Sequence, residues 1–456
     1  MDQMTTSGMT VNVPELIDQQ KVGSFQIRVL VLCGLAVTLD GFAAQMIGYL
    51  APSIAREMHL GPAGLTPIFA WGLVGLMLGA LIFGPVADRF GRKRVIVTCT
   101  AIFGLLSLST ALAHTAVSLA VFRFLAGLGF GGVMPNAIAL TAEYAPQRRR
   151  GEMVMIMFCG FPIGAMVAGF ATVRILPAFG WQGVFVLAGI MPLSLVPVLA
   201  ALLPESIRHL VIHGQQSGRV RQLLARVNSQ FVFGGDTNFV VREEHAPGMP
   251  VAHLFRQGRA IPTILLWIAF FVSLVDVYLM TSWLPTVFHD AGMALSLSLI
   301  ATALFQAGAV FACFVLGSVM DRFGAYRVLS LTYLSGAVFV ALLGHSHSVV
   351  SIMGCTFLAG IGILGGQTGS NVLAASFYPT YIRSTGVGWA LGIGRIGSIV
   401  GPIFGGFMLS QHWPLTSIFL AGAVPALVGS TAIFLMGRTQ GSVNVNAKDT
   451  IGAPAS

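Results

Sequence analysis

Charged residues are scarce in this chain. Asp, Glu, Lys and Arg make up 9% of its 456 residues, whereas a soluble domain carries about 25%. Hydrophobic residues make up 55%, and the mean hydropathy is +0.83. No single soluble core could hide so much apolar surface, so the composition excludes a soluble protein and predicts a chain surrounded by lipid.

Cysteine is also rare, and nucleotide-binding motifs are missing. The five cysteines lie inside apolar stretches, at the spacing of neither a metal site nor a disulfide framework. The chain has no Gly-x-x-x-x-Gly-Lys-[Ser/Thr] and no Gly-Lys pair, which argues against an ATP-driven pump. Residues 1–25 are polar and lack the apolar core of a cleaved signal peptide. We expect no enzymatic activity, no metal and no cofactor.

Long apolar stretches fill most of the sequence and predict an all-α membrane protein. We expect twelve spans, near residues 26–48, 65–87, 93–112, 117–142, 152–172, 182–203, 261–284, 296–320, 328–345, 350–377, 384–409 and 415–436. The predicted organisation is a tail (1–25), a six-helix half (26–203), a polar central loop (204–259), a second six-helix half (260–436) and a tail (437–456).

The net charge of +9 follows this topology rather than a nucleic-acid partner. If the N-terminus is cytoplasmic, the outer loops hold only Arg56 and Arg174, and two more arginines lie within spans. The remaining 21 basic residues face the cytoplasm, as the positive-inside rule requires. The sequence therefore predicts that both termini are cytoplasmic.

A charged turn occurs twice, half a chain apart. Gly84–Val95 recurs as Gly317–Val328, with eight of twelve residues identical at an offset of 233. The same offset maps another set of residues, Ala142, Pro146 and Arg150, onto Ala375, Pro379 and Arg383. An even number of spans separates the copies, so they are parallel repeats. Such repeats are typical of transporters whose substrate site lies between the halves, near the bilayer midplane.

Two six-span halves with Gly-x-x-x-Asp-Arg-x-Gly-Arg-Lys after the second span resemble the major facilitator superfamily, over nearly the whole chain. Three segments are similar to the aromatic acid:proton symporters within it: Asp40–Pro52, Tyr278–Pro285 and Phe377–Gly386. The resemblance implies a major facilitator fold and proton-coupled import of an aromatic carboxylate, such as a hydroxybenzoate, through a bacterial inner membrane. Its partners would be the organic anion, protons and lipid, and the protein would be a monomer.

The chain departs from that family at one position of the first span. The family usually reads Asp-Gly-Phe-Asp, and here the second acid is replaced by Ala43. In the family the acid that matches Asp40 is essential, so the resemblance implies that Asp40 binds protons and helps to bind substrate. Arg123-x-x-x-Gly127 resembles a further motif of the proton-coupled members, which assigns Arg123 to proton coupling. A fixed Asp40–Arg123 ion pair is the alternative.

Two further ionisable residues lie deep inside the spans, where a charge costs roughly 2.5–3.5 kcal/mol. Asp276 lies one helical turn beyond the repeat equivalent of Asp40, and we hypothesise that it replaces the acid missing at Ala43 in proton coupling. Arg395 offers a bidentate fork for the substrate carboxylate, a position that the resemblance supports. The alternatives are a polar residue near the outer mouth for Asp276, and a pair with Asp276 or the backbone for Arg395.

An aromatic substrate needs apolar walls, for which the predicted candidates are Phe42, Tyr278 and Trp389. These residues would otherwise face lipid or the interface. In the superfamily, the acid of the repeated turn is thought to latch the halves by contacting the start of span eleven, near Arg383. The predicted latch consists of two charged groups: Gly84, Asp88, Arg89, Gly91, Arg92, Glu143 and Arg150, and Asp321, Arg322 and Arg383. The alternative is that these charges only set topology.

Three other functions remain open at this point. A protein of this fold could transport a non-aromatic organic acid or a sugar. The replacement of the second acid by Ala43 leaves this alternative open. A transporter-like receptor without turnover is a second alternative, although a central loop of residues 204–259 is short for a signalling domain. A drug exporter is a third, and the two buried arginines suit an anionic substrate better than a cationic drug.

Overall fold

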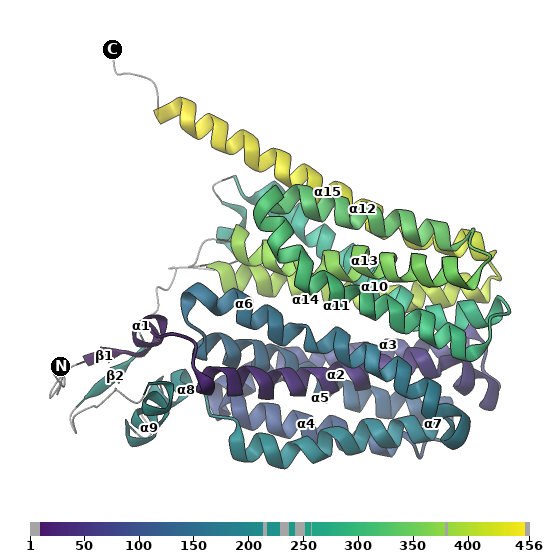
Figure 1. The fold of residues 1–456 in the computed structure, drawn as a ribbon, viewed down its shortest axis with the longest axis horizontal. Coiled ribbons are helices and arrows are strands. Elements are labelled where there is room, and N and C mark those ends of the chain that lie inside the picture. Colours follow the sequence, from purple (N-terminus) through teal and green to yellow (C-terminus); the bar gives the residue numbers. More distant parts are fainter. Residues whose placement is uncertain are drawn as a thin grey trace. The chain divides into compact units, whose positions relative to one another are not determined.

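The computed structural model describes residues 10–212, 217–228, 237–241, 251–256, 258–378 and 382–451. Long helices dominate these ranges (Figure 1). They are α2 (Ser24–Glu57), α3 (Pro62–Phe90), α4 (Arg92–Thr110), α5 (Ala116–Tyr144), α6 (Gln147–Phe158), α7 (Gly160–Leu202), α10 (Ala260–Asp290), α11 (Leu295–Phe323), α12 (Ala325–Leu343), α13 (Val349–Phe377), α14 (Arg383–Ser410) and α15 (Leu415–Ile451). The short elements are β1 (Thr10–Asn12), α1 (Val13–Asp18), α8 (Ile207–Ile212), α9 (Ser217–Val227), β2 (Asn238–Val240) and the 3₁₀ helix η1 (Ala252–Phe255).

Within the described residues, eleven apolar stretches of helix are long enough to cross a bilayer, and one of them contains two of the twelve predicted spans. One stretch, Gln147–Leu202, has 56 residues, and at 1.5 Å per residue it would extend about 84 Å. The hydrocarbon core of a bilayer is about 30 Å thick. Gly180, with φ 65° and ψ −175°, breaks the helix inside this stretch, so it forms two spans.

The repeat register of 233 residues reappears in the helix bounds. Adding 233 to the bounds of α3, α4 and α5 gives those of α11, α12 and α13 without any shift. Gly91 and Gly324 precede α4 and α12 with φ values of 100° and 89°. Thr115 and Ser348 cap α5 and α13, and each side chain accepts a hydrogen bond from the backbone N–H three residues later. The duplicated sequence therefore forms duplicated structure.

Packing divides the chain into two compact units. Unit 1 comprises Met1–Ala44, Val74–Ala165 and Ile175–Glu244, and unit 2 comprises Gln45–Leu73, Met166–Arg174 and His245–Ser456. This division differs from the predicted halves, 26–203 and 260–436, because residues 45–73 and 166–174 pack with the later helices. The predicted halves follow the repeat in the sequence, whereas the units follow contacts between helices.

In unit 1, α4 and α5 pack side by side, and α2 lies close against α7. Glycine allows this approach, since a Cβ at Gly164 would overlap the carbonyl oxygen of Thr38. Segments predicted as a tail and a loop also have structure. β1 pairs in parallel with β2, and α1 buries Val13 and Ile17. The N-terminal segment is therefore joined to the central loop by a short sheet.

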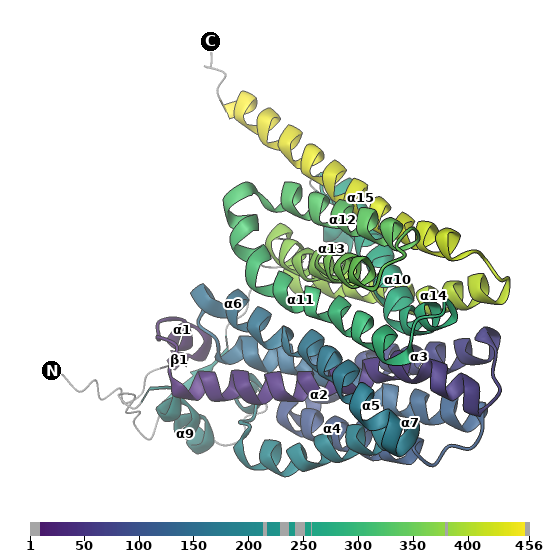
Figure 2. The same cartoon turned by 45° about the vertical axis from the view of Figure 1, so that its right-hand side comes forward.

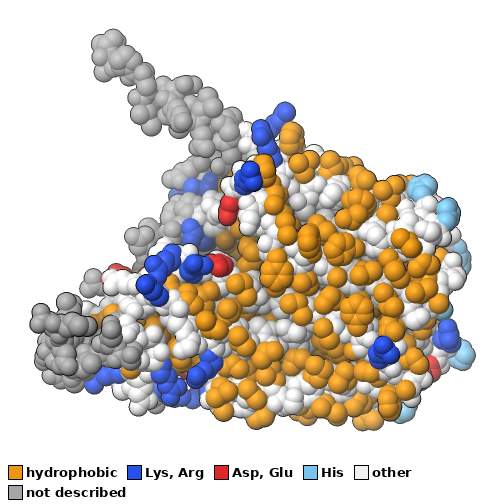
Figure 3. Space-filling view, in the orientation of Figure 1, with side chains coloured by type: hydrophobic (Ala, Val, Ile, Leu, Met, Phe, Trp, Pro, Cys, Tyr) orange, Lys and Arg blue, Asp and Glu red, His pale blue; other side chains and the backbone are white. Residues whose placement is uncertain are grey.

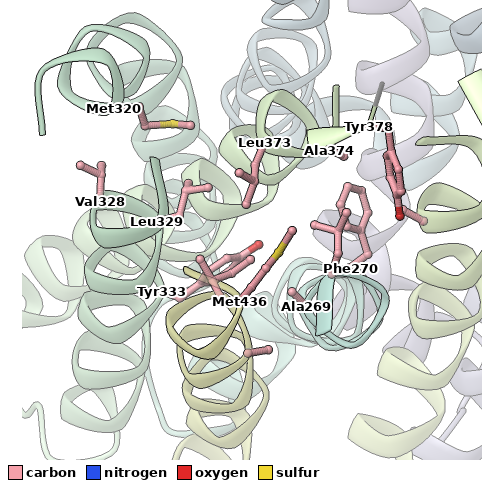
Figure 4. Packing of buried hydrophobic residues seen from close by; sticks show 14 of the residues in the cluster. Ala269, Phe270, Met320, Val328, Leu329, Tyr333, Leu373, Ala374, Tyr378 and Met436 are labelled. Carbon is pink, nitrogen blue, oxygen red and sulfur yellow. The ribbon is translucent and has the colours of Figure 1, made fainter. Parts of the chain in front are cut away.

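In unit 2, α10 packs against α14 and α15, α11 packs against α13, and α12 packs against α13 and α15 (Figures 1 and 2). A buried cluster joins these helices, and it includes Phe270, Leu329, Tyr333, Leu373 and Met436 (Figure 4). The long α10 is buried along most of its second half. Polar side chains in that half are therefore enclosed by other helices.

The sides of the helices present apolar side chains to the surroundings (Figure 3). Large residues such as Leu81, Phe179 and Val350 are well exposed. Lys and Arg side chains gather mostly near helix ends in the same view (Figure 3). A contiguous apolar surface of this kind requires a lipid environment.

Candidate functional site

Arg123 on α5 is the buried cation of unit 1, with 4% of its surface exposed. Its Nη1 donates to the carbonyl oxygen of Ala43 at 3.1 Å, and its Nη2 donates to that of Ala44 at 3.1 Å. The guanidinium also lies 5.7 Å from the ring centre of Phe130. The guanidinium of Arg123 thus contacts the backbone of α2 at residue 43, where the aromatic acid:proton symporters usually have their second acid.

Asp40 lies on α2, with 2% of its surface exposed. Its carboxyl lies within electrostatic range of the Cys99 thiol of α4, in unit 1. Phe42, two residues further along the same helix, is buried as well. The sequence prediction that Asp40 and Arg123 lie deep in the helix bundle is confirmed for their positions, while their roles remain predictions.

Asp276 on α10 is fully enclosed in unit 2. Neither of its carboxyl oxygens has a hydrogen-bond partner among the residues that the structure describes. The Tyr333 hydroxyl of α12 lies within electrostatic range of this carboxyl and shares a 2.9 Å hydrogen bond with the Ser370 hydroxyl of α13. A bare carboxylate without donors is costly in such a setting, and binding a proton removes that cost.

The repeat relation between the two acids is close but offset. The residue equivalent to Asp40 is Ser273, which is buried one helical turn before Asp276 on α10. The hydroxyl of Ser273 lies near the Tyr333 hydroxyl of α12. Each half of the sequence repeat therefore has one enclosed acid on its first long helix, Asp40 on α2 and Asp276 on α10.

The predicted substrate residues lie in different surroundings. Arg395 is half-buried on α14, and Tyr278 is buried on α10. Trp389 is 46% exposed and stacks on Trp267 of α10, with ring centres 5.8 Å apart. The exposed ring favours a lipid-facing or interfacial position for Trp389, which was the alternative interpretation.

The first copy of the charged turn is tied to α5. Arg92 forms an ion pair with Glu143, with Nη1 3.1 Å from Oε1. Gly91 has φ 100°, and a Cβ there would overlap the Glu205 carboxylate. Gly84, Asp88 and Arg89 end α3, where both charged side chains are exposed. The predicted grouping of Arg92 with Glu143 is confirmed.

Glu205 is a member of this cluster that the sequence did not identify. Its Oε1 accepts from the backbone N–H of Lys93 at 3.0 Å, at the start of α4, and from that of Ser206 at 2.9 Å. The Tyr144 hydroxyl donates to its backbone carbonyl at 2.7 Å. A buried acid at a helix N-terminus fits the orphan N–H groups there. The only sequence signal was a lone acid directly after Pro204.

Arg150 does not join Glu143, contrary to expectation. Its Nη2 lies 3.2 Å from Oδ1 of Asp18 in α1. The same oxygen accepts from the backbone N–H of Gln147 at 2.9 Å, and Arg148 donates to the Gln20 carbonyl at 3.1 Å. The N-terminal segment supplies the acid at the start of α6, because α1 packs there and Glu143 is already paired with Arg92.

The second copy of the turn lacks these partners. Asp321 and Arg322 are exposed at the end of α11. The repeat equivalents of Arg92 and Glu143 are Ala325 and Ser376, which cannot form an ion pair. Arg383 donates through Nε to the Tyr378 carbonyl at 3.3 Å, while Pro379, its predicted neighbour in the motif, falls outside the described residues. The two turns share a backbone conformation but differ in their ionic contacts.

Within the described residues, no cluster of three or more His, Cys, Asp or Glu side chains is arranged to hold a metal ion. The buried polar side chains of the long helices include the acids Asp40 and Asp276, Arg123, several amides and several hydroxyls.

Known proteins resemble this chain in sequence and in fold. The family model described as Major Facilitator Superfamily matches residues 33–343 and 266–456. The 4-hydroxybenzoate transporter PcaK of Pseudomonas aeruginosa is 39% identical over 429 residues, 94% of this chain and 96% of that protein. The gallate transporter of Pseudomonas putida is 38% identical over 94% of this chain and 96% of its own length. A solved structure of the xylose transporter XylE from E. coli has a TM-score of 0.70 at 16% identity, covering 90% of this chain and 97% of that one.

Proposed function

Because the chain belongs to the major facilitator superfamily, we propose that it imports an aromatic carboxylate of the hydroxybenzoate type together with protons. The observation that carries the proposal is the similarity, along nearly the full length, to transporters named for 4-hydroxybenzoate and gallate. The protein is a multi-pass membrane transporter and not an enzyme. We place it in the bacterial cytoplasmic membrane as a monomer, with both termini inside because most basic residues lie on that side.

Proton binding is assigned to the two enclosed acids and their surroundings. Asp40 and Asp276 bind protons from outside and release them inside, and Arg123 adjusts the charge next to Asp40. Within the described residues, neither carboxyl oxygen of Asp276 has a hydrogen-bond donor, which supports this assignment because proton binding neutralises the group where it lies. Arg123 donates hydrogen bonds to the backbone carbonyls of Ala43 and Ala44. Because residue 43 is an alanine, no carboxylate at that position neutralises the guanidinium.

Substrate binding is assigned to Arg395, with contributions from Asp40, Phe42, Tyr278 and Trp389. A guanidinium binds a carboxylate through two parallel hydrogen bonds, which a point charge cannot reproduce. Buried aromatic rings such as Phe42 and Tyr278 suit the face of a planar substrate. The exposure of Trp389 makes it the weakest member of this set.

Conformational latching is assigned to the repeated turns. The first group contains Gly84, Asp88, Arg89, Gly91, Arg92, Glu143 and Arg150, and the second contains Asp321, Arg322 and Arg383. The ion pair of Arg92 with Glu143 and the buried Glu205 support a stronger first turn. Breaking and remaking such contacts is how alternating access switches between two discrete packings.

Uptake into proteoliposomes tests the proposal directly. The purified protein is reconstituted, an inward proton gradient is imposed, and labelled 4-hydroxybenzoate, gallate and a small aliphatic acid are compared. We expect accumulation of an aromatic acid that collapses with a protonophore. Accumulation of the aliphatic acid alone would favour the alternative cargo that Ala43 suggests. Binding without accumulation of any acid would instead favour a receptor.

A further inference from the structure

Two contacts inside unit 2 join residues that are equivalent in the repeat. Gly48 on α2 lies against the backbone of Thr281 on α10, and a Cβ at Gly48 would overlap the Thr281 carbonyl oxygen. Eight residues later, Nη2 of Arg56 lies 3.1 Å from Nε2 of His289. Both pairs are separated by 233 residues, which is the register of the repeat. A residue meets its own equivalent only near the symmetry axis, so α2 and α10 cross there.

Prolines occupy equivalent positions between these two contacts. Pro52 in α2 and Pro285 in α10 are also 233 residues apart. Proline has no N–H, so in each helix the carbonyl four residues earlier receives no helical hydrogen bond. These carbonyls belong to Gly48 and Thr281, the residues at the crossing. Each helix therefore lacks one hydrogen bond between the crossing and its proline, and the proline lies one turn before Arg56 or His289.

Apolar and small residues fill the rest of this region of unit 2. Phe69 of α3 packs edge-on against Trp283 of α10, with ring centres 5.1 Å apart. The Thr66 hydroxyl lies where a Cβ of Gly406 on α14 would be. Tyr49 fills the space beside Gly169. The Arg56–His289 hydrogen bond is a polar contact between α2 and α10 beyond the prolines.

The geometry fixes the state of His289 in this arrangement. A guanidinium can only donate, so Nε2 of His289 must accept the hydrogen bond from Arg56. The proton of the neutral ring is then on Nδ1, which donates to the Met293 carbonyl at 3.2 Å. Protonation of Nε2 would remove the acceptor and place two cations about 3 Å apart. The contact therefore exists only while His289 is neutral.

We propose that Arg56 and His289 form a proton-operated contact that holds the outer ends of α2 and α10 together. Neutral His289 keeps the ends joined, and protonation releases them to move about Pro52 and Pro285. The inference rests on the proposed function for its orientation, which places these ends outside. External acid would then favour the outward-open state before substrate binds.

Other charged groups near the outer ends of α2 and α10 affect how the Arg56–His289 contact responds to pH. Asp290 acts electrostatically on His289 and can pair with the imidazolium once Arg56 has moved away. The described parts of α3, α11 and α15 that approach this end carry no titratable side chain there. The remaining charged or titratable groups near the ends of α2, α7 and α14 are Glu57, His59, Arg174 and His412. Of these groups, His289 forms the direct hydrogen bond across the crossing.

Cysteine accessibility tests this without any substrate. Ser282 is 6% exposed, and its Cα lies next to the position that a Cβ of Gly48 would take. Ser282→Cys is labelled from outside with an impermeant maleimide at about pH 5.5 and about pH 7.5. Ala63→Cys, at an exposed position of α3, corrects for the effect of pH on the thiol reaction. Both are made in a Cys355→Ser background, since the other four native cysteines are buried.

We expect the corrected labelling of Ser282→Cys to be about threefold or more faster at the lower pH. Adding His289→Gln keeps an acceptor for Arg56 that cannot titrate, so labelling should stay slow at both pH values. Adding His289→Arg places a permanent cation there, so labelling should be fast at both. Equal labelling at the two pH values with His289 intact, or a pH response that persists in His289→Gln, overturns the proposal.

A matched histidine serves as the control. His347 is exposed in the loop after α12 and forms no part of the crossing, so His347→Gln should keep the full pH response. Loss of the response in His347→Gln as well would assign it to general surface charge and also overturn the proposal. Because labelling needs neither substrate nor a proton gradient, a failure here is distinguishable from failure of the proposed uptake.

Discussion

The enclosed charges differ in how their surroundings hold them. Arg123 has two backbone carbonyls as acceptors, whereas the carboxyl of Asp276 has no hydrogen-bond partner among the described residues. Arg395 is only half-buried on α14. A guanidinium that already donates to two backbone carbonyls is poorly placed to bind a substrate anion. This counts against Arg123 as the partner of the substrate carboxylate, the role proposed for Arg395.

Replacing the guanidinium of Arg395 by an ammonium should weaken substrate binding while keeping the charge. In Arg395→Lys the bidentate hydrogen bonds become a single one, a loss of about 1.5–3 kcal/mol for charged partners. The KM for aromatic acid uptake should rise at least about tenfold, since 1.4 kcal/mol is a factor of ten. The measurement is initial uptake against substrate concentration in proteoliposomes.

Arg327→Lys is the matched control, because Arg327 is exposed in the first turn of α12 and has no assigned role. Its KM should equal that of the unaltered protein. An unchanged KM in Arg395→Lys would remove Arg395 from the substrate site. Equal losses in both variants would point to a general effect of replacing arginine.

Some site residues were predictable from the sequence, and others were not. Asp40, Arg123 and Asp276 stand out because an ionisable side chain within an apolar span is rare and costly. Glu205 and Asp18 lie among many charges in polar segments, and only the tertiary contacts with α4 and α6 distinguish them. A span that is apolar all round does not reveal which face meets lipid, so the 46% exposure of Trp389 was not predictable.

At the scale of helices and strands, the sequence repeat gave the most accurate prediction of the structure. The identical turns before α4 and α12 fixed a register, and the bounds of three helix pairs follow it without a shift. The break at Gly180 was predicted only as a gap between spans, because apolar residues continue on both sides of it. The β1–β2 pair was not predicted, since two three-residue strands carry no usable alternation.

The two turn glycines provide a matched pair for a stability measurement. Gly91→Ala and Gly324→Ala both place an alanine at positive φ, which costs about 1 kcal/mol. At Gly91 the new methyl group also meets the buried Glu205 carboxylate, whereas at Gly324 it meets nothing within 4 Å. We expect Gly91→Ala to lower the thermal midpoint clearly more than Gly324→Ala. The measurement is a thiol-reactive dye assay in detergent, which reports exposure of the buried cysteines.

Adding Glu205→Ala to Gly91→Ala separates the two contributions. The double variant makes room for the methyl group, so Gly91→Ala should cost less in that background than alone. Equal midpoints for Gly91→Ala and Gly324→Ala would show that Glu205 does not hold the first turn, and that the contacts of the two copies are energetically alike.

At the scale of the whole molecule, two coupling acids imply a stoichiometry. If Asp40 and Asp276 each carry a proton through the cycle, two protons accompany one monovalent anion, and each cycle moves one net positive charge inward. A potential of 100 mV, negative inside, then contributes about 2.3 kcal/mol, or about 50-fold in accumulation. With a single proton the cycle is electroneutral and the potential has no effect.

A potassium diffusion potential in proteoliposomes at equal pH on both sides measures this charge. The unaltered protein should accumulate an aromatic acid in response to the potential alone. Asp276→Asn keeps the shape of the side chain and removes one titrating group, so its uptake should respond to a pH gradient but no longer to the potential. Glu57→Gln, at an exposed acid of α2, should behave as the unaltered protein. Uptake by Asp276→Asn that still follows the potential would exclude Asp276 as a proton carrier, because the transported charge would then be independent of the acid enclosed in unit 2.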